Sequence, residues 1–581
     1  MIPQNEFDFR NAVKRGLLAG VITLSITIIG MVELFEERSL IANVLTMGQV
    51  LIFAATAILS FIYSKSLQSE NPRSWVLAGL TIGILSAPPL IILIWLAQVV
   101  NLRQFFANVS PNLIELLTFH QEPWIGSLLM VAVLALVGLI SSAISQLPEK
   151  YRRPLLNGLV GTLTIGLFSE IISLRSRSLV GDVIGSSAGK SFTNFLFSSK
   201  ALRVIPAIVS FILIAGLSVR RARQQEQNSE SRVSFSIMKD GVLQWRNITI
   251  VVVGLAFLPV LLGSYLSEVT NTVGIFILMG LGLNIVVGFA GLLDLGYVAF
   301  FAIGAYTMAI LTSEGDLGIA GISFWVALPV AVTVSAFAGL ILGMPVLRMR
   351  GDYLAIVTLG FGEIIRLLAL SDMLKPLFGG ALGILKIPKP YITFLDLYLV
   401  RPEHLYYVIL LGVALAAFVS WRLRDSRLGR QWMAMREDED VAEAMGINLV
   451  KTKLLAFSIG AAFSGLAGAI FASKLTSIFP HSFNLLISIN VLSLIIVGGI
   501  GSLPGVVVGA FILVGLPELL REFAEFRQLM YGALLVVMMI ARPEGFWPSS
   551  VHRRELHVGD ESPIDLDAAP ATSAGDSSRK L

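Results

Sequence analysis

The amino-acid sequence predicts an all-α, polytopic integral membrane protein with about sixteen transmembrane helices, six in an N-terminal part and ten in a C-terminal part. Two observations lead to this fold class, and a third limits its chemistry. Hydrophobic residues make up 55% of the 581 positions and charged residues only 14%, a balance that soluble globular proteins do not reach. Apolar stretches of about twenty residues, the length that crosses a bilayer as a helix, recur along the chain. The chain has no cysteine, which excludes disulfides, iron–sulfur clusters and thiolate zinc sites.

The net charge of +4 does not indicate a nucleic-acid-binding protein. The basic residues lie in short connectors at the ends of apolar stretches, where positive charge keeps a loop in the cytoplasm. A nucleic-acid-binding surface would gather them into one patch or stripe. The histidines show no ligand-like spacing, so we expect no metal site in this chain. They are His120, His404, His481, His552 and His557.

Residues 1–219 are predicted to form an N-terminal region of about six transmembrane helices. Their connectors alternate between richer and poorer basic content, which favours an N-terminus inside the cytoplasm. No small-residue cleavage site follows the first apolar run, which indicates a retained span rather than a removed signal peptide. The predicted spans are residues 16–32, 40–63, 75–99, 124–145, 155–174 and 204–219.

The connector 175–203 breaks this alternation, because it is basic although parity places it outside. It also contains the run from Gly185 to Ser191, GSSAGKS, which resembles a phosphate-binding loop. Ile184 stands where that motif requires its first glycine, and no strand precedes it. We therefore interpret the connector as a flexible loop and expect that this chain does not itself bind ATP.

Residues 220–247 are polar and strongly charged, and we interpret them as a cytoplasmic linker between two domains. The second domain, 248–546, holds about ten further spans, which return the C-terminus to the inside. Residues 547–581 lose the apolar pattern, so we expect a disordered cytoplasmic tail. The ten spans are residues 248–266, 272–290, 292–313, 323–346, 353–371, 404–421, 454–475, 485–499, 503–520 and 528–541.

The loop 422–453 is a dense block of charge between two long apolar segments, so it must lie outside the hydrocarbon and, being basic, inside the cell. An acidic run from Glu437 precedes Val441, and Gly446 follows Met445, which predicts a helix of at most two turns. So short a helix is unstable alone and must rest on neighbouring spans. It would offer Val441, Ala444 and Met445 to a partner. The alternative is a solvated connector that only marks topology.

Glycine interrupts the apolar pattern of the second domain at two places too close to their neighbours for ordinary loops. Tight helix packing explains the small residues of this domain in general, but these two places need a further explanation. The two places could be equivalent points of a five-span repeat, where discontinuous helices line a substrate path. The glycines are Gly288, Gly291 and Gly296 at the first place and Gly498, Gly499 and Gly501 at the second.

Four ionisable residues are predicted at membrane depth, where an unpaired charge is costly and usually functional. Glu363 and Arg366 are spaced to meet on one helical face, which favours a self-neutralising structural pair. Glu170 lies near a span end and could extend its carboxylate to the interface. Asp294 follows a glycine-rich turn and could either cap a broken helix or meet a substrate. No catalytic set of residues is visible, which favours a transport subunit driven by a partner.

Several long motifs resemble the LivM-type permeases of branched-chain amino acid ABC importers. They are Asn284–Tyr306, Leu347–Arg366, Ala434–Ile447, Val497–Ser502, Leu516–Glu518 and Arg542–Gly545, and they occur in the family's order over about residues 250–546. The resemblance implies a coupling helix, seated in a groove of an ATPase, formed by Arg436, Glu437, Asp438, Val441, Glu443, Ala444, Met445 and Gly446. It also makes the following residues candidates for the translocation path: Asn284, Asp294, Tyr297, Phe300, Tyr306, Thr358 and Glu363.

The resemblance further implies partners: a second, LivH-like permease, two ABC ATPases that bind ATP and magnesium, and an extracytoplasmic solute-binding protein. The chain itself would need no cofactor and would lie in a bacterial cytoplasmic membrane as a multi-pass protein. Two features depart from the family. Phe378 replaces the usual threonine of a glycine-rich segment, and the six N-terminal spans exceed the family's pattern. A permease for urea or short-chain amides, an ion-coupled secondary transporter and a membrane scaffold are the alternatives.

Overall fold

The computed structural model describes residues 7–67, 72–198, 201–227, 238–239, 242–243, 245–319, 321–346, 349, 351–392, 397–519, 526–542 and 544–548. The chain divides into two compact units, Met1–Ser236 and Ile237–Leu581, with the division inside the predicted linker. The expected disordered tail lies outside the described residues beyond Pro548. Each unit is described by itself.

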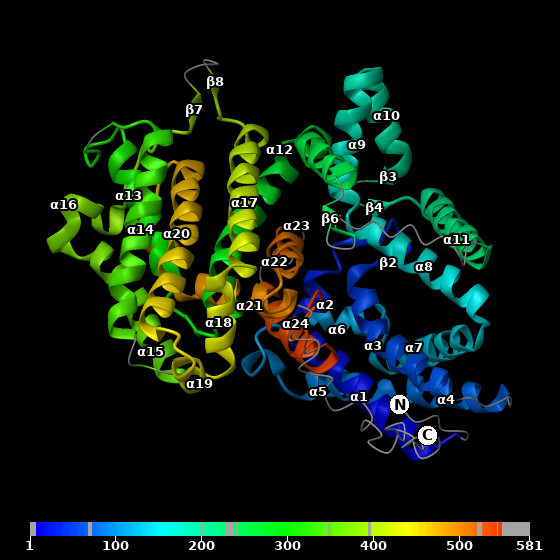
Figure 1. Ribbon diagram of the computed structural model, residues 1–581. Helices are drawn as coiled ribbons and strands as arrows, with labels where there is room; N and C mark the ends of the chain where they lie inside the picture. Colours follow the sequence, from blue (N-terminus) through cyan, green and yellow to red (C-terminus); the bar gives the residue numbers. More distant parts are fainter. Residues whose placement is uncertain are drawn as a thin grey trace, which may run out of the picture. The chain divides into compact units, whose positions relative to one another are not determined.

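The first unit is a set of helices with four very short strands (Figure 1). Its elements are α1 (Phe9–Ile28), α2 (Met31–Leu34), β1 (Ser39–Ile41), β2 (Leu45–Thr46), α3 (Met47–Ser66), α4 (Pro72–Ser86), α5 (Pro88–Val99), η1 (Leu102–Gln104), α6 (Pro111–Leu117), α7 (Pro123–Gln146), α8 (Glu149–Leu167), α9 (Ser169–Ile184), α10 (Ser186–Leu196), β3 (Phe197–Ser198), β4 (Ala201–Leu202) and α11 (Val204–Gln227).

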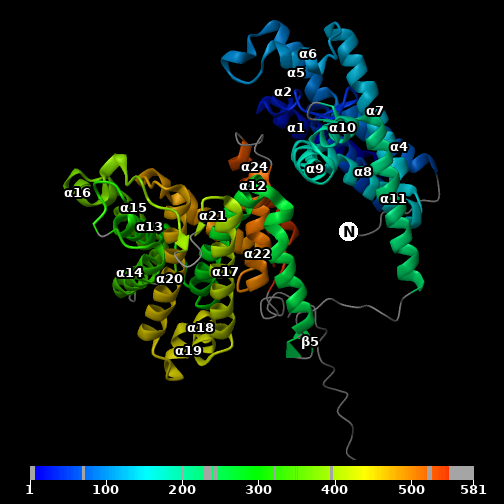
Figure 2. The same ribbon diagram turned by 90° about the horizontal axis from the view of Figure 1, so that it is seen from above.

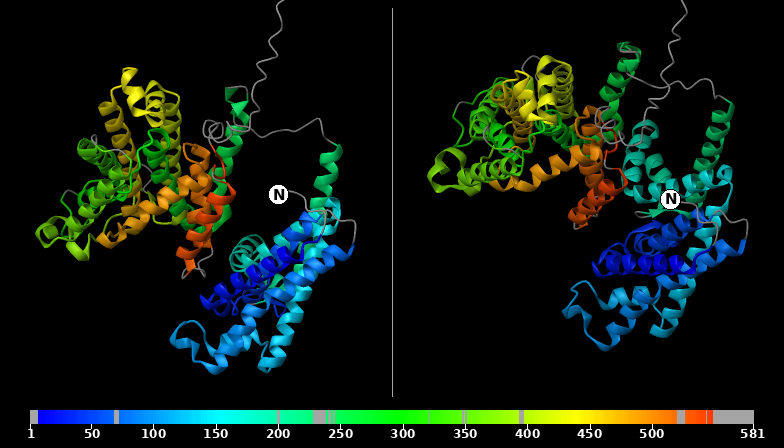
Figure 3. Two further views of the ribbon diagram at one scale, coloured as in Figure 1. Left: turned by 90° about the horizontal axis from the view of Figure 1, so that it is seen from below. Right: turned by 60° about the horizontal axis from the view of Figure 1, so that its bottom comes forward.

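Helices α1, α3, α4 and α7 pack side by side and form the centre of the first unit (Figure 3). Thr46 and Gln49 form a capping box that begins α3, in which each side chain bonds the other residue's backbone N–H. Strand β1 pairs antiparallel with β2 and parallel with β4, which joins the start of α3 to the start of α11. The Glu170 carboxylate lies 3.6 Å from the Arg38 guanidinium.

The prediction of a flexible loop over 175–203 is wrong, because α9 and α10 occupy most of it as a helical hairpin. Gly185, at φ 112°, makes the turn between them. A Cβ on Gly189 would lie 2.6 Å from the Arg177 carbonyl oxygen, so this glycine permits close helix packing. The predicted span 155–174 is also interrupted, since α8 and α9 meet at a bend of 70°.

The second unit also consists mainly of helices (Figure 2). Its elements are β5 (Met238–Lys239), β6 (Val242–Leu243), α12 (Trp245–Leu283), the π-helical turn η2 (Asn284–Phe289), α13 (Val298–Thr312), α14 (Phe324–Val346), α15 (Asp352–Leu370), η3 (Asp372–Leu374), α16 (Lys375–Phe378), η4 (Gly380–Leu382), β7 (Tyr391–Ile392), β8 (Leu397–Tyr398), α17 (Pro402–Arg424), α18 (Arg427–Glu437), α19 (Glu439–Ala444), α20 (Leu449–Leu475), η6 (Pro480–Ser482), α21 (Leu485–Gly498), α22 (Leu503–Ala510), the π-helical turn η7 (Phe511–Gly515), α23 (Leu516–Leu519) and α24 (Arg527–Ala541).

Helix α20 is the centre of the second unit and packs against α12, α13 and α14. Its buried seam of small residues includes Ala461, Gly465 and Ala469, the spacing that the sequence offers for close packing. Gly468 lies directly against the Phe301 carbonyl oxygen of α13. Figure 1 shows α18 and α19 at one end of α17, and β7 and β8 at the other.

Among the described residues, eleven helices are long and apolar enough to cross a membrane, or up to twelve if the bent pair α8 and α9 counts as one span. The prediction of an all-α polytopic membrane protein is therefore confirmed. The count of sixteen and the orientation stay predictions. The number of candidate helices is lower than the predicted sixteen because some predicted spans are bent, kinked or short. Helix α12 is non-helical at Gly263, and α13 and α24 each have only 15 residues.

Candidate functional site

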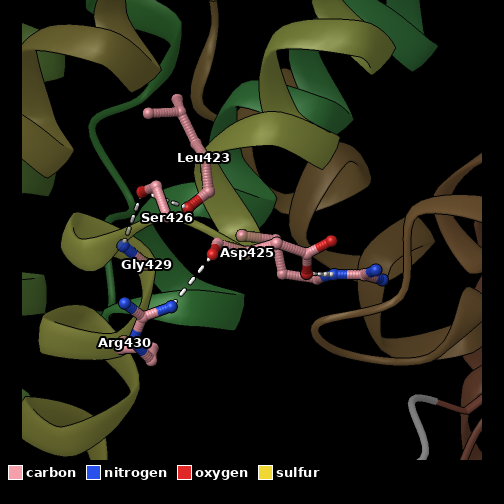
Figure 4. A network of polar contacts seen from close by, with 6 residues as sticks. Leu423, Asp425, Ser426, Gly429 and Arg430 are labelled. Atoms are coloured by element: carbon pink, nitrogen blue, oxygen red, sulfur yellow. Dashed lines mark hydrogen bonds and ion pairs between the residues drawn. The ribbon is translucent and has the colours of Figure 1, made fainter.

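The corner between α17 and α18 begins the charged loop, and local hydrogen bonds fix its geometry (Figure 4). Ser426 is the N-cap of α18: its hydroxyl accepts a hydrogen bond from the Gly429 N–H at 3.2 Å and donates to the Leu423 carbonyl at 2.7 Å. Arg430 Nη1 donates to the Asp425 carbonyl at 3.0 Å. The chain therefore leaves α17 in a defined direction.

Helix α18 is held against the start of α20 by a buried tryptophan. The Trp432 side chain is fully buried, and its Nε1–H donates to the Thr452 carbonyl at 2.8 Å. The sequence interpretation missed α18. A signal was present, because Ser426 is a good N-cap and Trp432 and Met435 are spaced to share one buried helical face.

The predicted short helix is present as α19, Glu439–Ala444. Asp438 is its N-cap and accepts hydrogen bonds from the N–H groups of Asp440 and Val441 at 2.9 and 3.0 Å. Gly446 follows the helix at φ 87°, a left-handed conformation that favours glycine. Two apolar side chains of this segment face solvent, with Val441 58% and Met445 79% exposed.

A salt bridge attaches α19 to α20. The Lys453 ammonium is only 3% exposed and lies 2.8 Å from both carboxylate oxygens of Glu439, which is 20% exposed. Ala442 is the buried residue on the inner face of α19. Helix α19 is therefore a small, firmly attached protrusion that exposes Val441 between the acidic Asp440 and Glu443.

Arg436 does not belong to this exposed face, although the sequence places it in the coupling segment. It lies in α18, and its Nη1 donates to the carbonyl of Gly288 in η2 at 3.0 Å. Its Nε and Nη2 donate to Glu437 at 3.3 and 3.0 Å. The charged loop is thus bonded directly to the first glycine-interrupted helix.

The two glycine-interrupted places meet in space. The Asn284 side-chain oxygen in η2 accepts a hydrogen bond from the Gly501 N–H at 2.9 Å, and Asn284 is fully buried. A Cβ on Gly288 would lie 2.8 Å from that Gly501 nitrogen. Gly498 lies directly against the Gly505 carbonyl, and a Cβ on Gly499 would lie 2.8 Å from the Trp547 carbonyl oxygen. Close backbone approach explains why small residues occupy these positions.

Asp294 lies in the segment that leads from η2 to α13 and does not cap that helix, whose N-cap is Tyr297. Its Oδ1 accepts a hydrogen bond from the Gly296 N–H at 2.9 Å, and its side chain is fully buried. The Thr358 hydroxyl of α15 accepts from the Leu295 N–H at 3.1 Å, and Gly296 lies directly against the Thr358 carbonyl. Asp294 and Thr358 therefore shape the interrupted helix.

The remaining path candidates do not bond the backbone between η2 and α13. Tyr297 and Phe300 are buried in the core, and the Tyr297 hydroxyl donates to the Gly460 carbonyl at 2.8 Å. Tyr306 packs edge-on against Phe378 with ring centroids 5.4 Å apart. Glu363 accepts from Arg366 Nε at 3.0 Å on α15, which is the ion pair that the spacing predicts.

A cavity of about 910 Å³ opens between the charged loop and the interrupted helices. Its wall combines the corner of α17 and α18 with η2, the start of α22 and the end of the described chain. The residues that line it are Gly288, Phe289, Arg424, Asp425, Met433, Ala434, Arg436, Glu437, Gly501, Ser502, Leu503, Pro504, Trp547 and Pro548. The cavity is large enough for a small solute.

Residues 265–542 match the family model described as the branched-chain amino acid transport system permease component. The high-affinity branched-chain amino acid transport system permease protein LivM of Salmonella typhimurium is 44% identical over 313 residues, which are 50% of this chain and 72% of that protein. This chain belongs to that permease family. LivM of Escherichia coli gives the same identity and coverage. The permease LivH of Escherichia coli is 32% identical over 126 residues, which are 21% of this chain and 40% of LivH.

The family assignment confirms the resemblance that the sequence motifs indicate. The matched residues contain η2, the charged loop and both interrupted helices, whereas the first unit lies outside them. No solved structure matches this chain.

Proposed function

We propose that this chain is the permease subunit of an ATP-driven importer for branched-chain amino acids, forming half of a translocation path. It would work with a second, LivH-like permease, two ABC ATPases that bind ATP and magnesium, and an extracytoplasmic solute-binding protein. Identity to LivM and LivH supports the transport class and the pairing of two permeases. The chain would lie in a bacterial cytoplasmic membrane, with the charged loop inside.

One observation carries the coupling role: α19 presents an exposed apolar face while its base is locked to the transmembrane helices. Val441 and Met445 face outward, and the Glu439–Lys453 salt bridge ties the same six-residue helix to α20. A partner subunit that covered Val441 and Met445 would remove their apolar surface from water. We assign Glu437, Asp438, Glu443, Ala444 and Gly446 to the surface around it, all exposed.

In this proposal ATP hydrolysis occurs in the separate ATPases, and their closure moves the permease between inward-open and outward-open states. Asn284, Asp294 and Thr358 are assigned to the support behind the path rather than to its wall, because they bond the backbone of the interrupted helices. An ion-coupled carrier is less well supported, since Glu363, one of its candidate proton carriers, is already paired with Arg366.

The test is uptake by the full-length chain reconstituted into proteoliposomes with its candidate LivH-like permease, ABC ATPases and solute-binding protein. Radiolabelled leucine, isoleucine and valine are supplied with the binding protein, and ATP is enclosed on the ATPase side. The proposal requires uptake that depends on ATP and persists with a protonophore. Uptake of urea or acetamide, with no uptake of the three amino acids, would show that the substrate is an amide rather than a branched-chain amino acid. Collapse with the protonophore at constant ATP would replace the transport class.

A further inference from the structure

We infer that Arg436 is the positioning residue that transmits movement of the charged loop to both interrupted helices. This inference rests on the proposed function and deepens it, because it assigns the internal connection rather than the ATPase contact. It starts from one bond: Arg436 Nη1 to the Gly288 carbonyl, 3.0 Å, between α18 and η2.

The Arg436 side chain is held rather than loose. The Arg436 side chain is 20% exposed, and the Glu437 carboxylate accepts hydrogen bonds from both its Nε and its Nη2. Gly291 adds a steric constraint, because a Cβ there would lie 2.5 Å from Arg436 Cγ. A guanidinium fork can bond two acceptors in one fixed plane, whereas a lysine ammonium cannot reproduce that geometry.

The acceptor of this bond lies in a backbone that is not closed by regular helical hydrogen bonds. In a regular α-helix the Leu292 N–H would donate to the Gly288 carbonyl. Here the Leu292 N–H donates to the Val286 carbonyl instead, and the Ala290 N–H donates to the Ile285 carbonyl. A π-helical turn of this kind is rare and frequently stands at a functional site. A side chain bonded to it can therefore bias its conformation.

The same turn contacts the second interruption. Asn284, four residues before Gly288, accepts the hydrogen bond from the Gly501 N–H at 2.9 Å. Arg436, η2 and residues 499–502 thus form one continuous set of contacts from the charged loop to both interruptions. Gly288, Arg436 and Gly501 also share the wall of the 910 Å³ cavity, so a shift of Arg436 would change its shape.

The test compares Arg436→Gln with Arg427→Gln in the complete reconstituted complex. Both variants lose one positive charge from α18, but Arg427 is exposed at the first residue of that helix. Leucine uptake and ATP hydrolysis are measured in the same vesicles. We expect Arg436→Gln to lower leucine transported per ATP about tenfold while ATP hydrolysis and complex assembly are retained, and Arg427→Gln to leave the ratio near wild type. An unchanged ratio in Arg436→Gln overturns the inference.

A second measurement does not depend on transport. The chain has no cysteine, so a single cysteine introduced at Leu503, on the cavity wall, is the only thiol of this chain, and gel separation of the subunits removes label on the partners. Its labelling rate with a water-soluble maleimide is measured with and without ATP and orthovanadate. We expect nucleotide to change that rate in the otherwise wild-type complex and to have no effect when Arg436→Gln is added. The inference is wrong if the nucleotide response survives in the double variant.

The two experiments separate this inference from the proposed function. If the wild-type complex takes up none of the three amino acids with ATP, the proposed function fails whatever the variants do. If wild type transports and Arg436→Gln transports with the same ratio, only the inference fails. Arg436→Lys supplies a further comparison, since one ammonium restores the charge without the two-acceptor geometry; full recovery would show that charge alone suffices and would contradict the positioning role.

Discussion

The buried Lys453 should make the attachment of α19 sensitive to a single substitution, Glu439→Gln. The change keeps the shape of the side chain and removes the charge that balances a lysine only 3% exposed. Breaking a fully buried ion pair by removing one partner costs about 3–5 kcal/mol. Because Glu439 is itself 20% exposed and glutamine keeps one acceptor oxygen, we expect a cost of about 2 kcal/mol.

This cost should appear as local opening rather than as global unfolding. Helix α19 has only six residues, too few to remain helical once it is detached. A loss of about 2 kcal/mol in local stability corresponds to amide exchange about 30-fold faster in this segment. Hydrogen–deuterium exchange of the purified chain, followed on peptides that cover residues 438–453, measures it.

The matched control is Glu443→Gln, which removes the same charge from the exposed side of the same helix. It should change exchange of these peptides by less than about twofold, as expected for an exposed side chain. If both variants accelerate exchange equally, or if neither does, the Glu439–Lys453 salt bridge does not hold α19 in place.

Three further predictions concern the surroundings of the site. Trp432→Phe should lower stability by about 1–2 kcal/mol, because the buried hydrogen bond to the Thr452 carbonyl is lost. Trp547→Phe, at a residue 58% exposed, should leave stability unchanged. Thermal unfolding in detergent compares the two variants. Thr358→Val should lower stability by about 1–3 kcal/mol, because it leaves the Leu295 N–H without its acceptor. Thr358→Ser keeps the hydroxyl and should retain most of that stability in the same assay. Equal melting temperatures of the valine variant and wild type would refute this. Replacing both Glu363 and Arg366 by glutamine should cost less than about 1 kcal/mol, since the Glu363 side chain is 44% exposed; a larger loss would show that the pair holds α15 in place.

Much of this architecture could be predicted from local chemistry. The helix at α19 followed from an acidic N-terminus and a glycine after its last turn, which are short-range signals. The pair Glu363 and Arg366 followed from helical spacing alone. The glycine interruptions were visible because Gly288 and Gly501 stand where apolar helices would otherwise continue.

The parts that could not be predicted depend on distant residues. Nothing in the sequence near Arg436 shows that its partner is the Gly288 carbonyl, 148 positions away. The contact between Asn284 and Gly501 joins residues 217 positions apart. Helices α9 and α10 were mistaken for a loop because their polar residues suggested solvent, whereas the close approach at Gly189 stabilises a helical hairpin.

The path candidates show the same limit. Tyr297, Phe300 and Tyr306 lie in a family motif, and the structure places them in the packed core around α20. A motif predicts which residues matter, but packing decides whether a residue supports the path or lines it. Asp294 and Thr358 illustrate the supporting case, since both bond the backbone between η2 and α13.

The central claim, that α19 is the surface through which separate ATPases drive this permease, is tested most directly by site-specific crosslinking. A photo-crosslinking amino acid at Met445 is compared in native membranes with the same amino acid at Met373, which is as exposed but follows α15 in η3. Met445 and Met373 are 79% and 78% exposed, so accessibility is matched. The account predicts a covalent adduct with an ABC ATPase from position 445 and none from position 373. Absence of an ATPase adduct at 445 from a complex that still transports leucine with ATP would contradict it.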